Sequence, residues 1–190
     1  MIGQRFSAED REQTEEATMR ADPSESGKVE VAPEFAERLA RGEITLADLI
    51  GMSKERQYEI AKVGYQLMNS GKLDEARAIY RGLVAADPFD SVFHCHLGAI
   101  QLRLGEIEAA IKEFTSALQL NSKNVEALAG RGEANLNRGQ LAEAISDLRA
   151  AVELDPRGER PATLRARALL LALREAAQRA PQTRADEAQK

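Results

Sequence analysis

The sequence predicts an all-α protein, a solenoid of stacked helical hairpins, and two observations carry that prediction. Three glycine pairs recur at one constant interval, with one alanine per interval in the same register. They are Gly64 with Gly71 and Ala76, Gly98 with Gly105 and Ala110, and Gly132 with Gly139 and Ala144. The 190-residue chain also has 43% hydrophobic but only 4% aromatic residues and no tryptophan, which favours alanine- and leucine-rich helices over a β-sandwich.

The interval between these glycine pairs matches the helix-turn-helix unit of the tetratricopeptide repeat (TPR), which is about 34 residues long. With residue 57 as the origin, the predicted repeats span residues 57–90, 91–124 and 125–158. The glycine at position 8 of each unit has a packing reason, because a small residue lets the two helices of a hairpin cross closely. Three such units predict a right-handed solenoid, whose concave surface is typically used to hold other polypeptides.

The segments outside the repeats differ in composition from the repeats and from one another. Residues 1–30 are polar and are expected to form a mobile tail. Residues 31–56 are expected to form an N-terminal helical segment of short helices, in which Pro33 begins the first helix and Ser53 caps the first repeat helix. Residues 159–180 are expected to form a capping helix that ends the solenoid, followed by a disordered tail at residues 181–190.

Charge and hydropathy exclude several classes of function. The net charge of −5 and the absence of a basic face argue against a nucleic-acid partner. No segment approaches the roughly 20 apolar residues that span a bilayer, and the N-terminus lacks the apolar run of a signal peptide, so a cytoplasmic location without a membrane partner is expected. Cys95 is the only cysteine and cannot form an internal disulfide.

The sequence offers little for catalysis or metal binding. His94, Cys95 and His96 are adjacent, so on a helix their side chains diverge by about 100° and cannot converge on one ion. No glycine-rich phosphate loop, nucleophile elbow or Cys-x-x-Cys pair occurs. We therefore expect no enzyme activity, no catalytic residues, no metal and no cofactor.

A second stripe on the first helix of each repeat points to the binding surface. Positions 2, 5, 9 and 12 lie on the side turned away from the partner helix and toward the predicted groove. These residues are Tyr58, Ala61, Tyr65 and Met68 in the first repeat, Val92, Cys95, Ala99 and Leu102 in the second, and Glu126, Ala129, Glu133 and Leu136 in the third. His96 is added as a lining residue. The groove is therefore expected to be apolar at one end and acidic at the other.

Two alternatives bear on this stripe. Ala61, Ala99 and Ala129 are as well explained by packing between neighbouring repeats as by the groove. TPR domains that grip a C-terminal Glu-Glu-Val-Asp peptide resemble one another in a clamp of Lys, Asn and Arg side chains. The matching places here hold Ala61, Tyr65, His96, Glu126 and Gly130. Because glutamate repels a carboxylate, chaperone-tail binding of that kind is not expected.

The chain resembles a particular TPR family, the class II chaperones of type III secretion systems that escort translocator proteins. The resemblance covers roughly residues 39–158. It rests on the leader at residues 46–53, on Tyr58, Ala61 and Tyr65, on the stretch 71–76, and on the junctions at 90–93 and 97–99. The stretch 71–76 is ordinary TPR sequence, whereas the leader and the junction at 90–93 are more specific.

The resemblance implies a small bacterial cytoplasmic chaperone without catalysis, which holds an extended apolar segment of a translocator-like client in the groove. It also implies self-association through the N-terminal part, giving a homodimer. The apolar residues outside the repeats that would carry this contact are Phe35, Leu39, Leu46, Leu49 and Ile50. The alternative function is that of a generic TPR adaptor or scaffold in a multiprotein complex.

Overall fold

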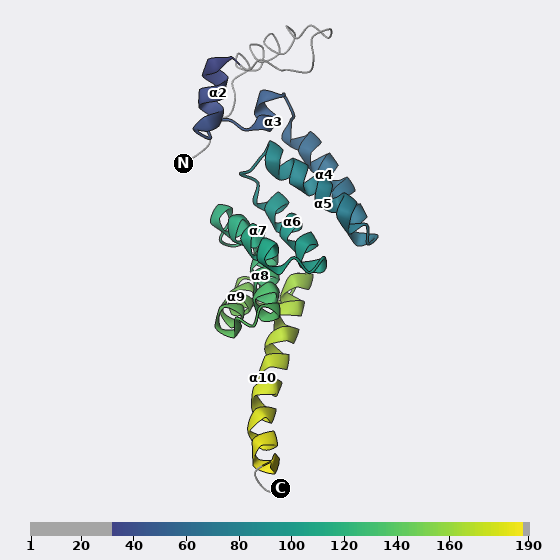
Figure 1. Cartoon of the computed structure of the whole chain (residues 1–190), viewed down its shortest axis with the longest axis vertical. Helices are drawn as coiled ribbons and strands as arrows, with labels where there is room; N and C mark the ends of the chain where they lie inside the picture. Colours follow the sequence, from purple (N-terminus) through teal and green to yellow (C-terminus); the bar gives the residue numbers. More distant parts are fainter. Residues whose placement is uncertain (1–31, 188–190) are drawn as a thin grey trace.

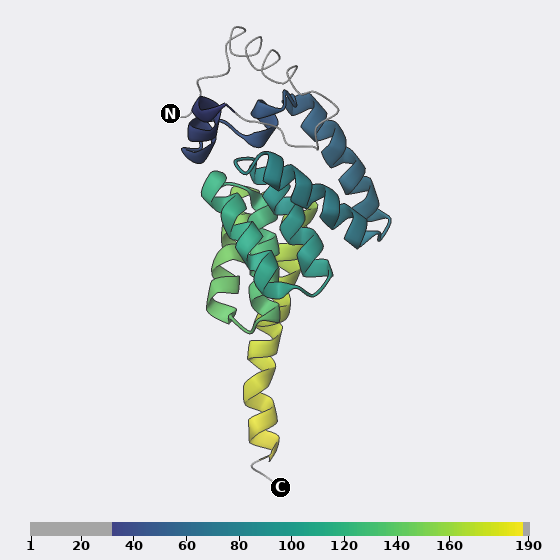
Figure 2. The same ribbon diagram turned by 45° about the horizontal axis from the view of Figure 1, so that its top comes forward.

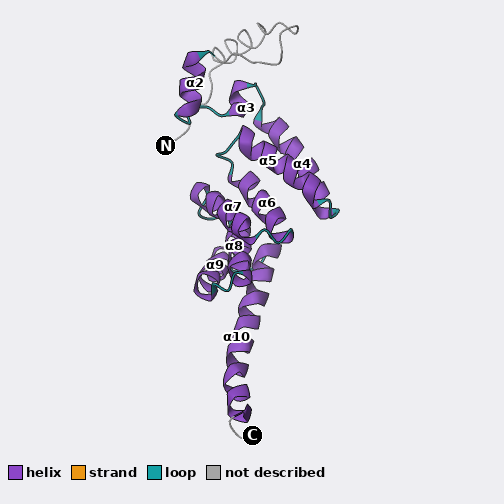
Figure 3. Ribbon diagram, in the orientation of Figure 1, coloured by secondary structure: helices purple, strands orange, loops and turns teal. Residues whose placement is uncertain are grey.

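The computed structural model describes residues 32–187, and all regular structure within them is helical (Figures 1 and 3). The helices are α2 (Pro33–Ala40), α3 (Leu46–Leu49), α4 (Lys54–Asn69), α5 (Leu73–Ala86), α6 (Ser91–Arg103), α7 (Ile107–Leu120), α8 (Val125–Asn137), α9 (Leu141–Leu154) and α10 (Pro161–Glu187). The predicted all-α class is confirmed. The predicted mobile tail at residues 1–30 lies outside the described residues, as do residues 188–190 of the predicted C-terminal tail.

Each hairpin begins at a residue whose side chain caps its first helix. Ser53 caps α4, Asp90 caps α6 and Asn124 caps α8, and each side-chain oxygen accepts a hydrogen bond from a backbone N–H in the first turn. Serine, aspartate and asparagine are the preferred residues at this position, because their short side chains satisfy an N–H group that has no partner within the helix. The sequence therefore sets the start of each repeat locally.

The recurring glycines serve two purposes. The second glycine of each pair forms the turn within the hairpin, and its left-handed backbone explains why glycine is needed there: φ is +82° at Gly71, +79° at Gly105 and +81° at Gly139. The first glycine lies where the two helices cross. A Cβ atom at Gly64 would lie 2.8 Å from the Tyr80 ring, and Gly98 and Gly132 face Phe114 and Leu148 in the same way. The packing role predicted for these glycines is confirmed.

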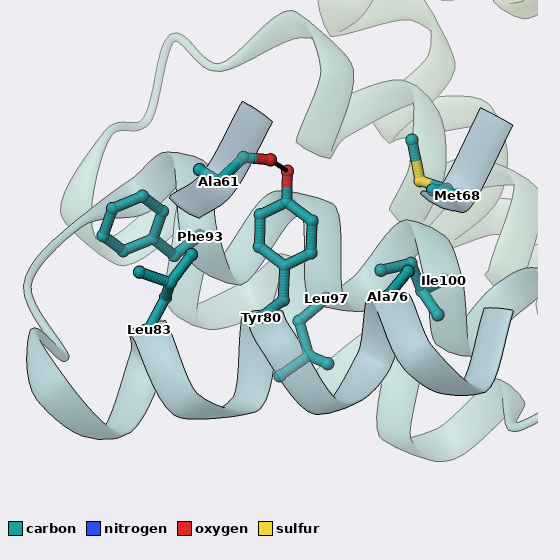
Figure 4. Packing of buried hydrophobic residues seen from close by; sticks show 8 residues of the cluster. All are labelled: Ala61, Met68, Ala76, Tyr80, Leu83, Phe93, Leu97 and Ile100. Carbon is teal, nitrogen blue, oxygen red and sulfur yellow. Dashed lines mark hydrogen bonds between the residues drawn. The ribbon is translucent and has the colours of Figure 1, made fainter. Parts of the chain in front are cut away.

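The hydrophobic core runs along the stack as a series of clusters between hairpins. The first cluster joins the first repeat to α6 and consists of Ala61, Met68, Ala76, Tyr80, Leu83, Phe93, Leu97 and Ile100 (Figure 4). The Tyr80 hydroxyl donates a 2.9 Å hydrogen bond to the carbonyl oxygen of Ala61. Tyr80 is thus buried with its one polar group satisfied, as buried tyrosines require.

Helix α10 continues the array as the first helix of an incomplete fourth repeat. It packs against both α8 and α9. Its Ala166, which is fully buried, follows Gly132 by one repeat period, so a small residue again occupies the crossing position. Asp155 fixes the start of the helix by accepting hydrogen bonds from the Thr163 hydroxyl and from three backbone N–H groups, and these bonds lower its pKa to about 2.

Beyond its first turns α10 projects away from the other helices (Figures 1 and 2). The helix continues to Glu187, beyond the predicted end at residue 180 and into the predicted disordered tail. Helix propensity does not explain the extension, because Pro181 lies within it and proline is the least favourable residue in a helix interior. No helix in the described part of the chain is both long enough and apolar enough to cross a membrane.

Candidate peptide-binding face

The first helices of the hairpins form a row. Helix α4 contacts α6, α6 contacts α8, and α8 contacts α10. The exposed and half-buried stripe residues of this row, together with two arginines near the start of α10, form a surface that we call the inner face. Its residues are Tyr58, Tyr65, Val92, His96, Ala99, Leu102, Glu126, Glu133, Leu136, Arg160 and Arg165.

Side-chain contacts join neighbouring helices of the row. The Tyr65 ring of α4 meets the His96 ring of α6 edge-on, with centroids 5.7 Å apart. Farther along, both carboxylate oxygens of Glu126 lie 3.0 Å from Nη1 of Arg160. These contacts join side chains of neighbouring helices, with aromatic groups at the α4 end and ion pairs at the α10 end.

The aromatic end of the face carries exposed apolar area. Tyr58, Tyr65 and Val92 are 44%, 47% and 37% exposed. Leu102 is half-buried. Large apolar side chains gathered on one face of a soluble protein mark a surface suited to a partner. All four residues are among those predicted to line the apolar end of the groove.

Tyr58 is fixed in place more firmly than Tyr65. Its hydroxyl donates a 2.9 Å hydrogen bond to Asp90, and its ring packs against Phe93 with centroids 5.4 Å apart. Lys54 bonds the same carboxylate at 3.1 Å. The Tyr58 ring is thus held rigidly on the face, while its hydroxyl links the first repeat to the cap of the second.

Four of the predicted groove residues lie in the core instead. Ala61, Cys95 and Ala129 occupy position 5 of their repeats, and all three are buried. Position 5 is the line along which neighbouring first helices touch, so the packing alternative holds for both alanines at this position. Met68 is buried as well and packs in the first cluster. These four side chains are not available to a partner. Burial also raises the pKa of the Cys95 thiol to about 12, so it stays a neutral packing group.

The predicted acidic end of the groove needs correction. Arg160 pairs with both carboxylate oxygens of Glu126, and Nε of Arg165 lies 3.8 Å from Glu133. Arg160, directly before α10, and Arg165 within it therefore place a positive charge opposite each glutamate, and this end of the face is close to neutral. Arg160 follows Glu126 by one repeat period, so extending that period into the capping helix would have identified it.

The two histidines of the chain have opposite environments. Nδ1 of His94 lies 2.7 Å from Oε2 of Glu113, and its Nε2 lies 3.0 Å from the carbonyl oxygen of Pro88. Both ring nitrogens thus face acceptors, which favours the imidazolium form. The hydrogen bond to Glu113 is the largest cause of a raised pKa at His94, outweighing burial. His94 is a structural residue that ties α6 to α7 and to the loop before α6.

We expect His94→Gln to destabilise the fold more at about pH 6 than at about pH 8. Because the folded pKa is raised above the unfolded value of 6.5, the proton on His94 stabilises the fold fully below that value. The contribution is lost as the pH rises through the folded pKa. Thermal melts of both proteins at the two pH values measure the effect. An equal difference in melting temperature at both values would contradict the charged pairing.

Other sites are less suited to ligands. No group of three or more histidine, cysteine, aspartate or glutamate side chains that could hold a metal ion occurs among the described residues. A cavity of about 560 Å³ lies on the other side of α8, between α7 and α9. The charged side chains at its floor pair with each other, because Arg131 donates two 2.8 Å hydrogen bonds to Asp147. The cavity offers a ligand no free charge at that floor.

The chain has similarity to known proteins along most of its folded length. A family model described as tetratricopeptide repeat matches residues 97–159. The low calcium response locus protein H of Yersinia pestis is 29% identical over 118 residues, which are 62% of this chain and 70% of that protein.

Solved structures show the same likeness. The type III secretion translocator chaperone SycD of Yersinia enterocolitica is 27% identical, with a TM-score of 0.60, over 68% of this chain and 98% of that one. SycD in complex with a peptide of the translocator YopD is 25% identical, with a TM-score of 0.58, over 66% and 98%.

Proposed function

Because this chain belongs to the TPR class II chaperones of type III secretion systems, we propose that it holds an extended apolar segment of a translocator client on its inner face. The observation that carries the proposal is the exposed apolar surface of Tyr58, Tyr65 and Val92, which lies where the first two hairpins adjoin. A similar chaperone, SycD, has been solved with a translocator peptide.

The same surface explains why such a protein would act as a chaperone. Each large apolar side chain that a client covers contributes on the order of 1–3 kcal/mol, so a few contacts suffice for micromolar binding after the cost of association. Binding also covers apolar surface of the client, which would otherwise aggregate. Holding a segment needs no reaction, so the proposal includes no catalysis and no cofactor. It also includes a bacterial cytoplasmic location, where a client is held before export.

Isothermal titration calorimetry with the YopD peptide tests the proposal. The whole chain is expected to bind this peptide with a dissociation constant of about 1–10 µM. A scrambled peptide of the same composition is the control for nonspecific apolar contact. Equal affinity for both peptides, or no binding of either, would argue for the adaptor function with an unrelated partner.

We further propose self-association through the N-terminal segment. Of its five predicted contact residues, Phe35 is buried within the protomer and so cannot contribute. Leu49 is half-buried, while Leu39, Leu46 and Ile50 are 37%, 41% and 53% exposed. Leu46 and Ile50 lie one helical turn apart, so they form one exposed apolar edge that a second copy could cover.

We expect the double variant Leu46→Asp, Ile50→Asp to be monomeric while the unmodified chain is dimeric, because two buried charges would oppose the contact. Light scattering measures both masses. Leu141→Asp, at a similarly exposed site on α9, should leave the dimer intact. A monomeric unmodified chain, or a double variant that stays dimeric, would contradict the proposal.

A further inference from the structure

His96 differs from Tyr58, Glu126 and Glu133 of the inner face because its ring has no polar partner. Neither ring nitrogen is hydrogen-bonded within the described residues, in contrast to His94, where both are. The ring lies between Tyr65 of α4 and Tyr80 of α5, with centroids 5.7 Å and 5.0 Å away. It is partly exposed. A polar group in an apolar setting normally finds a partner in the protein, in water or in a ligand.

An extended peptide needs such a group. Each of its residues carries a backbone N–H and a C=O, and a face lined by helices offers no strand edge with which to pair them. Other polar side chains of the inner face are already engaged: the Tyr58 hydroxyl bonds Asp90, and Glu126 and Glu133 pair with arginines. His96 remains uncommitted, directly beside the exposed ring of Tyr65.

We propose that a ring nitrogen of His96 accepts a hydrogen bond from a main-chain N–H of the bound peptide, that the ring is a neutral imidazole when it does so, and that peptide binding therefore weakens in acid. The inference rests on the proposed function and adds the polar contact and its regulation to the apolar surface. The ligand it implies is an extended peptide segment that is apolar where it crosses α6 and brings no carboxylate to that point.

The surroundings of His96 favour its neutral form. The groups that face it are Tyr65 of α4, Tyr80 of α5, Glu126 of α8, and Asp90 at the start of its own helix. The two carboxylates are held by Arg160 and Lys54, which reduces their attraction for a proton on His96. Burial dominates and lowers the pKa of His96.

A bound peptide strengthens this effect. By covering the ring it removes more water, so the charged form becomes still less favourable in the complex than in the free chain. The free chain then binds the proton more readily than the complex does. By linkage, affinity for the peptide must fall as the pH drops through the pKa of His96.

The experiment is calorimetry with the YopD peptide at about pH 7.5 and about pH 5, on the whole chain and on three variants. We expect the unmodified chain to lose affinity severalfold at the lower pH, because the free chain then binds a proton that the complex excludes. His96→Gln keeps a hydrogen-bonding group without titrating, so it should bind within about threefold of the unmodified chain at pH 7.5 and show little change with pH. His96→Leu should bind about fivefold more weakly at pH 7.5, the effect of one lost hydrogen bond.

His94→Gln is the matched control, since it removes the other histidine of the same helix without touching the inner face. It should retain the pH dependence of binding. Circular dichroism at both pH values shows that each variant is folded. As a second measurement, nuclear magnetic resonance titration of the His96 ring should give a lower pKa with the peptide than without it.

Three results would overturn the inference: unchanged affinity in His96→Leu, full pH dependence in His96→Gln, or a His96 pKa that does not fall when the peptide binds. In each case the unmodified chain still binds the peptide, so the proposed function stands. If the unmodified chain binds no peptide at either pH, the proposed function fails and the inference fails with it.

Discussion

Replacing Gly130 with alanine is expected to destabilise the fold by about 2 kcal/mol, although alanine is the better helix former. A Cβ atom at this position would lie 2.4 Å from Cζ of Phe114 and 2.6 Å from its Cε1. The Phe114 ring is 1% exposed and is enclosed in the cluster between the second and third repeats, so it cannot swing away. The backbones of α7 and α8 would have to separate instead.

Gly82→Ala provides a matched control. Gly82 lies in α5, and a Cβ atom there would meet nothing within 4 Å. With no clash, the gain in helix propensity should stabilise the chain by up to about 1 kcal/mol. Urea denaturation followed by circular dichroism measures both free energies of unfolding. The two substitutions should shift stability in opposite directions, and a Gly130→Ala variant as stable as the unmodified chain would show that repeats two and three are not packed as described.

Charging the apolar end of the inner face should remove peptide binding without unfolding the solenoid. In the double variant Tyr65→Glu, Val92→Glu, both side chains start about half-exposed, so the free chain can hydrate the new carboxylates. A bound peptide would have to cover two charges in place of two apolar contacts. Losing two contacts of roughly 1.5 kcal/mol each, with a desolvation cost added, predicts a loss of at least about hundredfold in affinity.

Calorimetry with the YopD peptide and circular dichroism of the free protein measure these effects. The control is Leu120→Glu with Leu141→Glu, two similarly exposed leucines on the second helices of the hairpins. It adds the same charge to the chain and should bind normally. A loss of less than about threefold in the Tyr65, Val92 variant, with its helical signal intact, would move the binding surface away from the inner face.

The repeat architecture could be predicted from the sequence because its signals are local. Each repeat needs a left-handed turn and a close helix crossing, and only glycine meets the first requirement easily. Gly71 and Gly64 therefore mark the hairpin directly, and the caps at Ser53 and Asp90 mark the helix starts. Because the same residues recur at a constant interval, the same local signals identify the second and third repeats.

The binding face could be predicted only in part, because exposure depends on how repeats sit against one another. One stripe on a helix contains both the line where neighbouring helices touch and the side chains beside it. Cys95 and Tyr65 belong to the same predicted stripe, yet one is buried between helices and the other is half-exposed. Position within the repeat separates them, since position 5 is buried in all three repeats.

The charge of the face could not be predicted from the stripe because ion pairing depends on a helix outside the three repeats. Glu126 and Glu133 indicated an acidic end, but Arg160 and Arg165 come from the capping segment, whose register against α8 is a tertiary property. This pairing changes the expected chemistry of the client. A client need not be basic at this end, and selectivity shifts to the apolar and polar groups around His96.

Photo-crosslinking tests most directly the claim that the client lies on the inner face. Benzoylphenylalanine placed at Tyr65 reports on this face, and the same group placed at Leu141, 53% exposed on α9, reports on the second helices. Both proteins are irradiated with the YopD peptide, and the products are mapped by mass spectrometry. We expect an adduct with the peptide from position 65 and none from position 141. An adduct from position 141 alone would contradict it and place the client on the opposite side of the solenoid.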